Sequence, residues 1–402
     1  MEVRLKINTV TLDFETTTAN KGHPFTPSNY PVSYSIKVNN GLTTFHYFTE
    51  PDFLTCLRSE ISKCNLLVCA NGKFELLWLF RMGIQLPNDC DVFDVLLAEH
   101  IITGQEAIMA SLDEVLSSYG LPPKQDKVKE YWSVGIDTPD IPKDILEEYN
   151  NIDVENTYAL FNTQVTISSG KSHKLILVSG KDTIALAEAE FNGIKFDQEK
   201  ANQVVRQYGE ELRAFQQELD TYLPAELPDT CKFNWESGDQ LSCLLYGGSI
   251  EFEWRTEDLA EYKSGSRKGE KYLKGTWHSH VQDFPRRFNP LDGTKVKKSQ
   301  DENYTGGTIY YQVDDPTLKQ LKTRKNEDKR LLEILDKTAK LTKVISMIDT
   351  FNKCFRDLQW EDNMVHGQFN QNIARTGRLS SSKPNLQNTS PEVDQLLVSR
   401  YD

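Results

Sequence analysis

Two carboxylates with short spacing stand near the beginning of the chain. Asp13 and Glu15 are two residues apart, and side chains at i and i+2 of an extended strand point to the same side. Neighbouring carboxylates repel each other unless a cation neutralises them, and oxygen ligands of this kind suit Mg²⁺ or Mn²⁺. The pair predicts a metal site, although a solvated strand end is the plainer interpretation of an isolated Asp-x-Glu.

Two further segments strengthen this prediction. Asn71-Gly72-Lys73-Phe74-Glu75 follows an apolar run and opens a predicted helix, which brings Glu75 to a second strand edge. Tyr149 and Asp153 are four residues apart in another predicted helix, so the hydroxyl and the carboxylate share one helix face. With the first pair, Glu75 and Asp153 predict a cluster of four acids.

The elements that must position these residues alternate between strands and helices. Period-two alternation predicts a strand at 3–8, which Asp13 follows, and a second strand at 32–38. Short strands are also expected at 45–48 and 66–69, and helices at 52–63, 73–82, 92–102, 111–119, 143–165, 166–220 (broken at Asn192-Gly193) and 326–355. The order of strands and helices is typical of a mixed sheet with helices packed on it, so the predicted fold class is α/β.

Length and composition indicate a soluble protein of several domains. The 402 residues allow two to four domains, and 38% hydrophobic with 26% charged residues exclude long disorder. No apolar run approaches the roughly 18 residues of a membrane span, and no secretory pattern opens the chain. Seven cysteines without a Cys-x-x-Cys pair predict free thiols in a reducing compartment. We therefore expect a cytoplasmic location and no membrane partner.

The net charge of −13 is distributed unevenly. Residues 1–165 contain 12 basic and 23 acidic residues, which gives −11, whereas residues 263–343 contain 19 and 11, which gives +8. A basic stretch inside an acidic chain can follow a phosphate backbone. A solvated lysine-rich surface is the plainer interpretation of charge alone.

In this order and with this spacing, Asp-x-Glu, Asn-x-x-Phe-Glu and Tyr-x-x-x-Asp resemble the motifs of the proofreading 3′–5′ exonuclease domain of DNA polymerases. The resemblance is to the class with four carboxylates and a tyrosine, and it covers residues 1–165. It implies a ribonuclease H-like domain in which two Mg²⁺ or Mn²⁺ ions are bound. The implied ligands are Asp13, Glu15, Glu75 and Asp153, with Tyr149 as a further catalytic residue and Asn71 as a DNA contact.

One residue departs from the family pattern, because the second motif usually ends in Asp and here ends in Glu75. The additional methylene can shift a metal by about an ångström, and such misplacement can cost on the order of 10²-fold in rate. Asp94 is the rival for this role. It falls too far after Asn71, and we interpret it as structural.

The implied chemistry is hydrolysis of a phosphodiester at the 3′ end of single-stranded DNA. Two cations roughly 3.5–4 Å apart would bracket the scissile phosphate, one generating hydroxide and the other stabilising the leaving 3′-oxygen. Tyr149 would orient the water rather than take its proton, because a phenol with a pKa near 10 is a poor base at neutral pH.

A second motif lies near the C-terminal end. The string TGRLSSSKPNLQN at 376–388 closely resembles the TGRLSSxxPNLQN segment of family A (DNA polymerase I-like) DNA polymerases. AEFNGIKFD at 189–197 and the predicted helix at 326–355 also resemble the family's connector and thumb. Arginine and amide side chains suit phosphates and minor-groove acceptors. The implied DNA contacts are Arg375, Thr376, Arg378 (at the primer end), Ser380, Ser381, Asn385, Gln387 and Asn388.

The resemblance implies three parts. These are an exonuclease domain at 1–165, a connector and mainly helical thumb at 166–370 with a strand-rich, basic insertion at about 249–322, and the beginning of the palm at 371–402. No DYSxxE or HDE string and no fingers helix follow Asn388, so nucleotide addition is not expected from this chain alone. The expected partners are single-stranded and primer–template DNA, and a second polypeptide that carries palm and fingers. The expected source is a phage, acting in the host cytoplasm.

Two other functions stay open. A DNA-binding half of a split polymerase, with weak or no nuclease activity, would explain Glu75 and the missing palm motifs. A stand-alone RNA-trimming nuclease would share the carboxylate site, but it leaves residues 376–388 unexplained. We therefore predict a DNA replication protein with proofreading exonuclease activity, and keep these two as alternatives.

Overall fold

The computed structural model describes residues 8–122, 127–168, 170–261, 263–264, 270–294, 296–298, 309–324, 328–358 and 364–399. The chain divides into two compact units, one of residues 1–201 with 347–402 and one of residues 202–346. This division is based on contacts between residues. The division into an exonuclease domain, a connector with thumb and the beginning of a palm is based on sequence motifs, and it stays a prediction.

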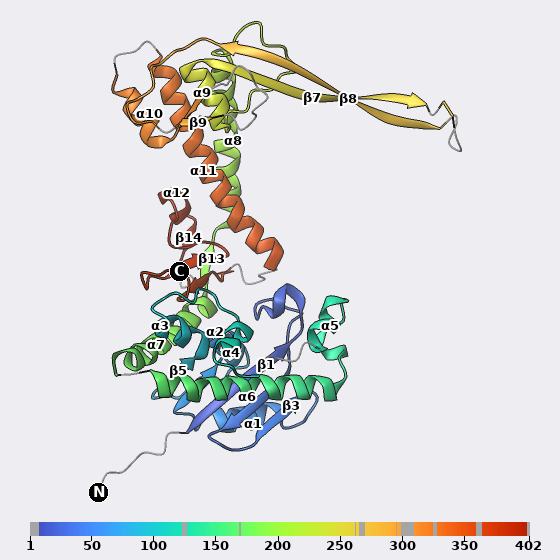
Figure 1. Cartoon of the computed structure of the whole chain (residues 1–402), viewed down its shortest axis with the longest axis vertical. Coiled ribbons are helices and arrows are strands. Elements are labelled where there is room, and N and C mark those ends of the chain that lie inside the picture. Colours follow the sequence, from blue (N-terminus) through green and yellow to red (C-terminus); the bar gives the residue numbers. More distant parts are fainter. Residues whose placement is uncertain are drawn as a thin grey trace. The chain divides into compact units, whose positions relative to one another are not determined.

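The first unit is built on a five-stranded mixed sheet with the order β3-β2-β1-β4-β5. Figure 1 labels β1, β3 and β5 of this sheet. Its strands are β1 (Thr9–Thr16), β2 (Pro31–Val38), β3 (Thr43–Tyr47), β4 (Leu66–Cys69) and β5 (Asp91–Asp94). The first three are antiparallel neighbours, whereas β4 pairs parallel with β1 and with β5. The predicted α/β class is confirmed.

Helices cover this sheet. They are α1 (Phe53–Ile61), α2 (Gly72–Arg81), α3 (Val95–Ile102), α4 (Leu112–Ser118), α5 (Lys127–Ser133), α6 (Lys143–Ile167) and α7 (Gly170–Asn192). Val10, Leu12 and Phe14 of β1 point to one face, where they share an apolar core with α1 and α2. Helix α6 packs along β1, β2 and β3, and the intervening residues of β1, which include Asp13 and Glu15, belong to the other face.

Two predicted elements differ from the structure. The strand expected at 3–8 lies mostly outside the described residues, and the described strand, Thr9–Thr16, contains Asp13 and Glu15 instead of preceding them. The helix expected at 92–102 begins only at Val95, because Asp91–Asp94 forms β5. A short apolar run fits a buried strand and a buried helix equally, so periodicity did not separate the two.

Residues 364–399 complete the first unit. Strands β11 (Met364–Val365) and β14 (Leu397–Val398) pair with β6 (Ile194–Phe196), and β12 (Gln368–Asn370) pairs with β13 (Ser380–Ser382). The buried carboxylate of Glu190 in α7 accepts hydrogen bonds from Lys73 Nζ (2.6 Å) and from the backbone N–H of Phe369 (2.6 Å). This ion pair anchors β12 on α2 and α7.

Among its described residues, the second unit contains a long hairpin, two whole helices (α9 and α10) and parts of two others (α8 and α11). These elements are α8 (Gln198–Asp220), α9 (Gly238–Tyr246), β7 (Gly248–Glu261), β8 (Lys271–Phe284), α10 (Asp315–Lys322) and α11 (Lys329–Leu358). Helices α8 and α11 confirm the predicted helical segments. Ile250 and Phe252 enter the core at the base of the hairpin. Farther along it, Trp277 is 69% exposed.

The predicted insertion at about 249–322 is rich in strands, as expected, but it is not uniformly basic. Strand β7 carries five acidic residues and one arginine, so the positive charge lies in other parts of the insertion. Within the described part of the chain, no helix is long and apolar enough to cross a membrane.

The packing of α7 on β5 can be tested by a substitution at Gly180 of α7. A Cβ at Gly180 would lie 1.9 Å from the carbonyl oxygen of Val92. Because the helix or the strand must then move, we expect Gly180→Ala to lower the free energy of unfolding by about 1–3 kcal/mol. Gly209 of α8 is the matched control, since a Cβ there meets no atom within 4 Å. Gly209→Ala should instead stabilise by up to about 1 kcal/mol. Calorimetric unfolding measures both, and a neutral Gly180→Ala would contradict the observed packing.

Candidate active site

Three acids from two elements meet beside the sheet. Asp13 and Glu15 belong to β1 and Asp153 belongs to α6, and one carboxylate oxygen of each lies within 4.8 Å of the others. Asp153 is 1% exposed and Glu15 is 8% exposed. Buried carboxylates this close together repel each other strongly, and a divalent cation with a preference for oxygen ligands relieves the repulsion. The donor set therefore fits Mg²⁺ or Mn²⁺.

The acids lie in a polar layer between the sheet and α6, which we call the polar seam. It consists of Thr11, Asp13 and Glu15 of β1, Ser33, Ser35 and Lys37 of β2, and Asn150, Asn151, Asp153 and Glu155 of α6. The antiparallel register places Asp13 opposite Ser35 and Glu15 opposite Ser33. Ser33, Ser35 and Asn150 are fully buried, and buried polar groups require hydrogen-bond partners.

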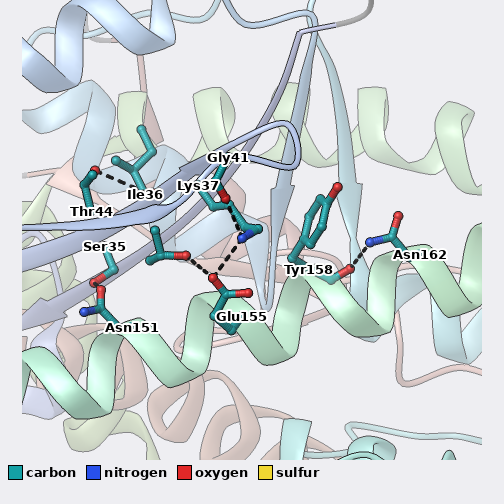
Figure 2. A network of polar contacts seen from close by, with 10 residues as sticks. Ser35, Ile36, Lys37, Gly41, Thr44, Asn151, Glu155, Tyr158 and Asn162 are labelled. Carbon is teal, nitrogen blue, oxygen red and sulfur yellow. Dashed lines mark hydrogen bonds and ion pairs between the residues drawn. The ribbon is translucent and has the colours of Figure 1, made fainter.

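Figure 2 shows how the seam joins β2 to α6. Ser35 Oγ donates to Asn151 Oδ1 (2.8 Å), and Lys37 Nζ donates to Glu155 Oε1 (2.8 Å) and to the carbonyl oxygen of Gly41 (2.7 Å). The hydroxyl of Thr43 donates to the same Glu155 oxygen. These bonds attach α6 to β2, the strand next to β1.

Glu75 occupies a different place. It lies in the first turn of α2 and is 2% exposed, but it is not part of the group of three acids within 4.8 Å. Among the described residues, its Oε2 has no hydrogen-bond partner. Burial, followed by the charge of Asp13, raises the pKa of Glu75 well above its usual value. The role of Glu75 as a metal ligand stays a prediction.

Asp94 is structural, as predicted. Its carboxylate accepts hydrogen bonds from the backbone N–H of Gly72 (2.9 Å), Leu96 (2.9 Å) and Leu97 (3.3 Å). It also accepts from the N–H of Asn71 (3.3 Å), a residue with a φ of 70°. Asp94 thus caps α3 and holds the turn that leads into α2. Burial raises the pKa of Asp94 and the backbone bonds oppose this shift.

Tyr149 lies on α6 one turn before Asp153. Its side chain is 6% exposed, and its ring meets the ring of Trp132 edge to face with centroids 6.1 Å apart. Burial, followed by the charges of Glu15 and Asp153, raises the pKa of the phenol. The raised pKa favours the protonated phenol, which can donate a hydrogen bond.

The residues predicted to contact DNA occupy two places. Asn71 is exposed at the beginning of α2, while the others lie in the segment from 375 to 388. In that segment Ser380 and Ser381 are half-buried in β13, and Ser381 Oγ accepts from the N–H of Leu386 (3.0 Å). Exposed residues in the same segment are Arg375, Thr376, Arg378, Asn385, Gln387 and Asn388. Their DNA contacts stay predictions.

The motifs did not single out Asn150, yet it touches the acid group. Asn150 Nδ2 donates to Asp13 Oδ2 over 2.7 Å. The two residues are 137 positions apart in the sequence, so no local pattern contains this contact. The one sequence signal that pointed to Asn150 was its position next to Tyr149.

Comparison with known proteins agrees with the C-terminal motif and with the fold. Residues 290–397 match the family model of DNA polymerase family A. The POL domain of Pol1 from M. smegmatis, solved in complex with DNA primer-template and dNTP, is similar with a TM-score of 0.62 and 16% identity. The similarity covers 97% of this chain and 54% of that chain, so this chain spans about half of its structural relative. No curated protein matches the chain. The predicted resemblance to family A DNA polymerases is confirmed, and the structural likeness establishes the fold.

Glu75 makes the stability of the metal-free protein depend on pH. Because the pKa of Glu75 is raised in the folded state, protonation of Glu75 stabilises the folded protein. This contribution to the free energy of unfolding is fully present below the pKa of an unfolded Glu, about 4.3, and is lost as the pH rises through the folded pKa. In chelator, Glu75→Gln should therefore unfold at a higher temperature than the unsubstituted protein at pH 7, and the difference should vanish near pH 4. Thermal unfolding between pH 4 and pH 8 checks this.

The matched control is Glu148→Gln, which makes the same change of side chain at an exposed position of α6. Parallel curves for the Glu75→Gln and unsubstituted proteins would contradict the raised pKa.

Proposed function

We propose that the chain is part of a family A DNA polymerase and that residues 1–165 form a 3′–5′ exonuclease domain acting on single-stranded DNA. The observation that carries the proposal is the group of Asp13, Glu15 and Asp153, whose carboxylate oxygens lie within 4.8 Å of one another. The match of residues 290–397 to the family A model supports the link to DNA polymerases.

The side chains of the site have separate tasks in this proposal. Asp13, Glu15 and Asp153 bind divalent cations, which supply the charge that activates water and stabilises a phosphodiester transition state. Tyr149 keeps its proton and orients the attacking water by donating a hydrogen bond. Glu75 is the proposed fourth ligand, and a bound cation would favour its ionised form because opposite charges lower the pKa of a carboxyl group.

The exposed segment from 375 to 388 is proposed to contact primer–template DNA through Arg375, Arg378 and its amide side chains. The structural relative is a complex with primer-template and dNTP, which supports this assignment. Nucleotide addition needs palm and fingers, which we expect from a further segment or a second polypeptide. A phage source and action in the host cytoplasm remain part of the proposal.

The nuclease activity is tested by digesting a 5′-labelled single-stranded DNA oligomer with Mg²⁺, with Mn²⁺ and with chelator. We expect a metal-dependent ladder from the 3′ end. Asp13→Ala and Asp153→Ala should each reduce the rate by at least about 10³-fold, because each removes a charge that a metal-assisted transition state requires. Glu148→Ala, on the exposed face of the same helix, is the control. Undiminished digestion by both site variants would refute the assignment.

DNA binding by the C-terminal segment is tested with a primer–template duplex at several salt concentrations. Replacing Arg375 and Arg378 together by Ala should weaken binding, and the slope of log Kd against log salt should fall by about 1 for each phosphate that an arginine no longer neutralises. Lys63→Ala, at an exposed site on the first unit, should change neither quantity. An unchanged Kd and slope in the double variant would exclude these arginines from the interface.

A DNA-binding half without nuclease activity is the second candidate, and the position of Glu75 outside the acid group favours it. Folded protein that binds DNA and produces no ladder with either cation would support this candidate. Digestion of RNA in preference to matched DNA would instead favour an RNA-trimming nuclease.

A further inference from the structure

We propose that Asn150 is a positioning residue that holds the Asp13 carboxylate in its metal-binding orientation. The inference rests on the proposed function, because it assigns a role within the same site. Asn150 lies on α6 and is fully buried in the polar seam, where it contacts one residue of β1 and one of β2. It occupies an unspecified position of the Tyr-x-x-x-Asp motif.

The orientation of the Asn150 amide follows from its neighbours. Nδ2 lies 2.7 Å from Asp13 Oδ2 and 3.3 Å from the backbone oxygen of Asp13. An ionised carboxylate and a carbonyl oxygen accept hydrogen bonds and donate none, so the NH₂ group must face them. Oδ1 then faces the hydroxyl of Ser33, which donates over 3.3 Å.

This arrangement fixes Asp13 at two points. One amide group binds both the side chain and the backbone of Asp13, which restricts rotation of the carboxylate about its own side-chain bonds. Ser33 in turn holds the amide, and Ser33 lies on the strand next to β1. Asn150 brings no charge into the seam, so it orients Asp13 without competing for a cation. Residues that orient metal ligands in this way typically contribute about 10- to 100-fold to metal affinity.

The adjacent residue provides a matched control. Asn151 makes an equivalent bond from α6 to β2, accepting from Ser35 Oγ over 2.8 Å (Figure 2). It lies one position along the helix from Asn150. If Asn–Ser bonds served only to attach α6 to the sheet, removal of either amide would have similar effects on metal binding.

The experiment is calorimetric titration of the full chain with Mn²⁺ alone, without DNA, together with thermal unfolding in chelator. The proteins compared are the unsubstituted chain, Asp13→Ala, Asn150→Leu, Ser33→Ala and Asn151→Ala. Leu has the same number and branching of heavy atoms as Asn but cannot donate, so Asn150→Leu removes the hydrogen bonds while occupying the same place. Hydrolysis of single-stranded DNA is then measured as a function of Mn²⁺ concentration.

We expect Asn150→Leu to weaken Mn²⁺ binding about 10- to 100-fold and to raise the Mn²⁺ concentration for half-maximal hydrolysis by a similar factor. Ser33→Ala should weaken Mn²⁺ binding by at least about 3-fold, which is a smaller effect than that of Asn150→Leu. Asn151→Ala should leave Mn²⁺ binding unchanged. Unchanged Mn²⁺ affinity in Asn150→Leu, or an equal decrease in Asn151→Ala, would overturn the inference. If Asn150→Leu fails to fold, Ser33→Ala decides by the same criterion.

The proposed function fails in a distinguishable way. It fails if the unsubstituted chain binds no Mn²⁺, or if Asp13→Ala binds it as tightly as the unsubstituted chain. If Asp13→Ala abolishes binding while Asn150→Leu keeps it, the metal site stands and the role of Asn150 is wrong.

Discussion

The repulsion among three neighbouring carboxylates, two of them buried, is the constraint on which the first unit depends. Asp13, Glu15 and Asp153 place ligand oxygens within 4.8 Å of one another, an arrangement that costs free energy until a cation binds. Around the acids, the seam contains neutral amides and hydroxyls and the ion pair Lys37–Glu155. Rigid placement of this kind favours metal binding, because the cost of bringing the ligands together is met during folding.

The sheet provides this placement through the alternation of its two faces. Leu12 and Phe14 of β1 face the apolar core, while Asp13 and Glu15, on intervening positions, belong to the face along α6. A register slip of one residue would exchange the two sets, so burial of the apolar face also specifies the position of the acids. Stability and the candidate chemistry therefore depend on the same strand register.

Much of this could be predicted from the sequence, because the signals are local. Alternation identified β2, and the spacing of Tyr149 and Asp153 on one helix face placed both in α6. The location of Glu75 relative to the other acids depends on how α2 packs, which no spacing encodes. The bond between Asn150 and Asp13 joins two distant segments. Strand β5 was missed because its two apolar residues, Val92 and Phe93, fit a helix equally well. Local patterns predicted the elements, whereas contacts between elements required the structure.

The central claim is that Asp13, Glu15 and Asp153 form one metal site. The most direct measurement is a crystal structure of the full chain grown with Mn²⁺, with diffraction recorded at a wavelength where manganese scatters anomalously. The account predicts an anomalous peak within about 2.0–2.3 Å of carboxylate oxygens from β1 and from α6. A fully ordered site with no peak at saturating Mn²⁺, or a peak held by other residues alone, would contradict it.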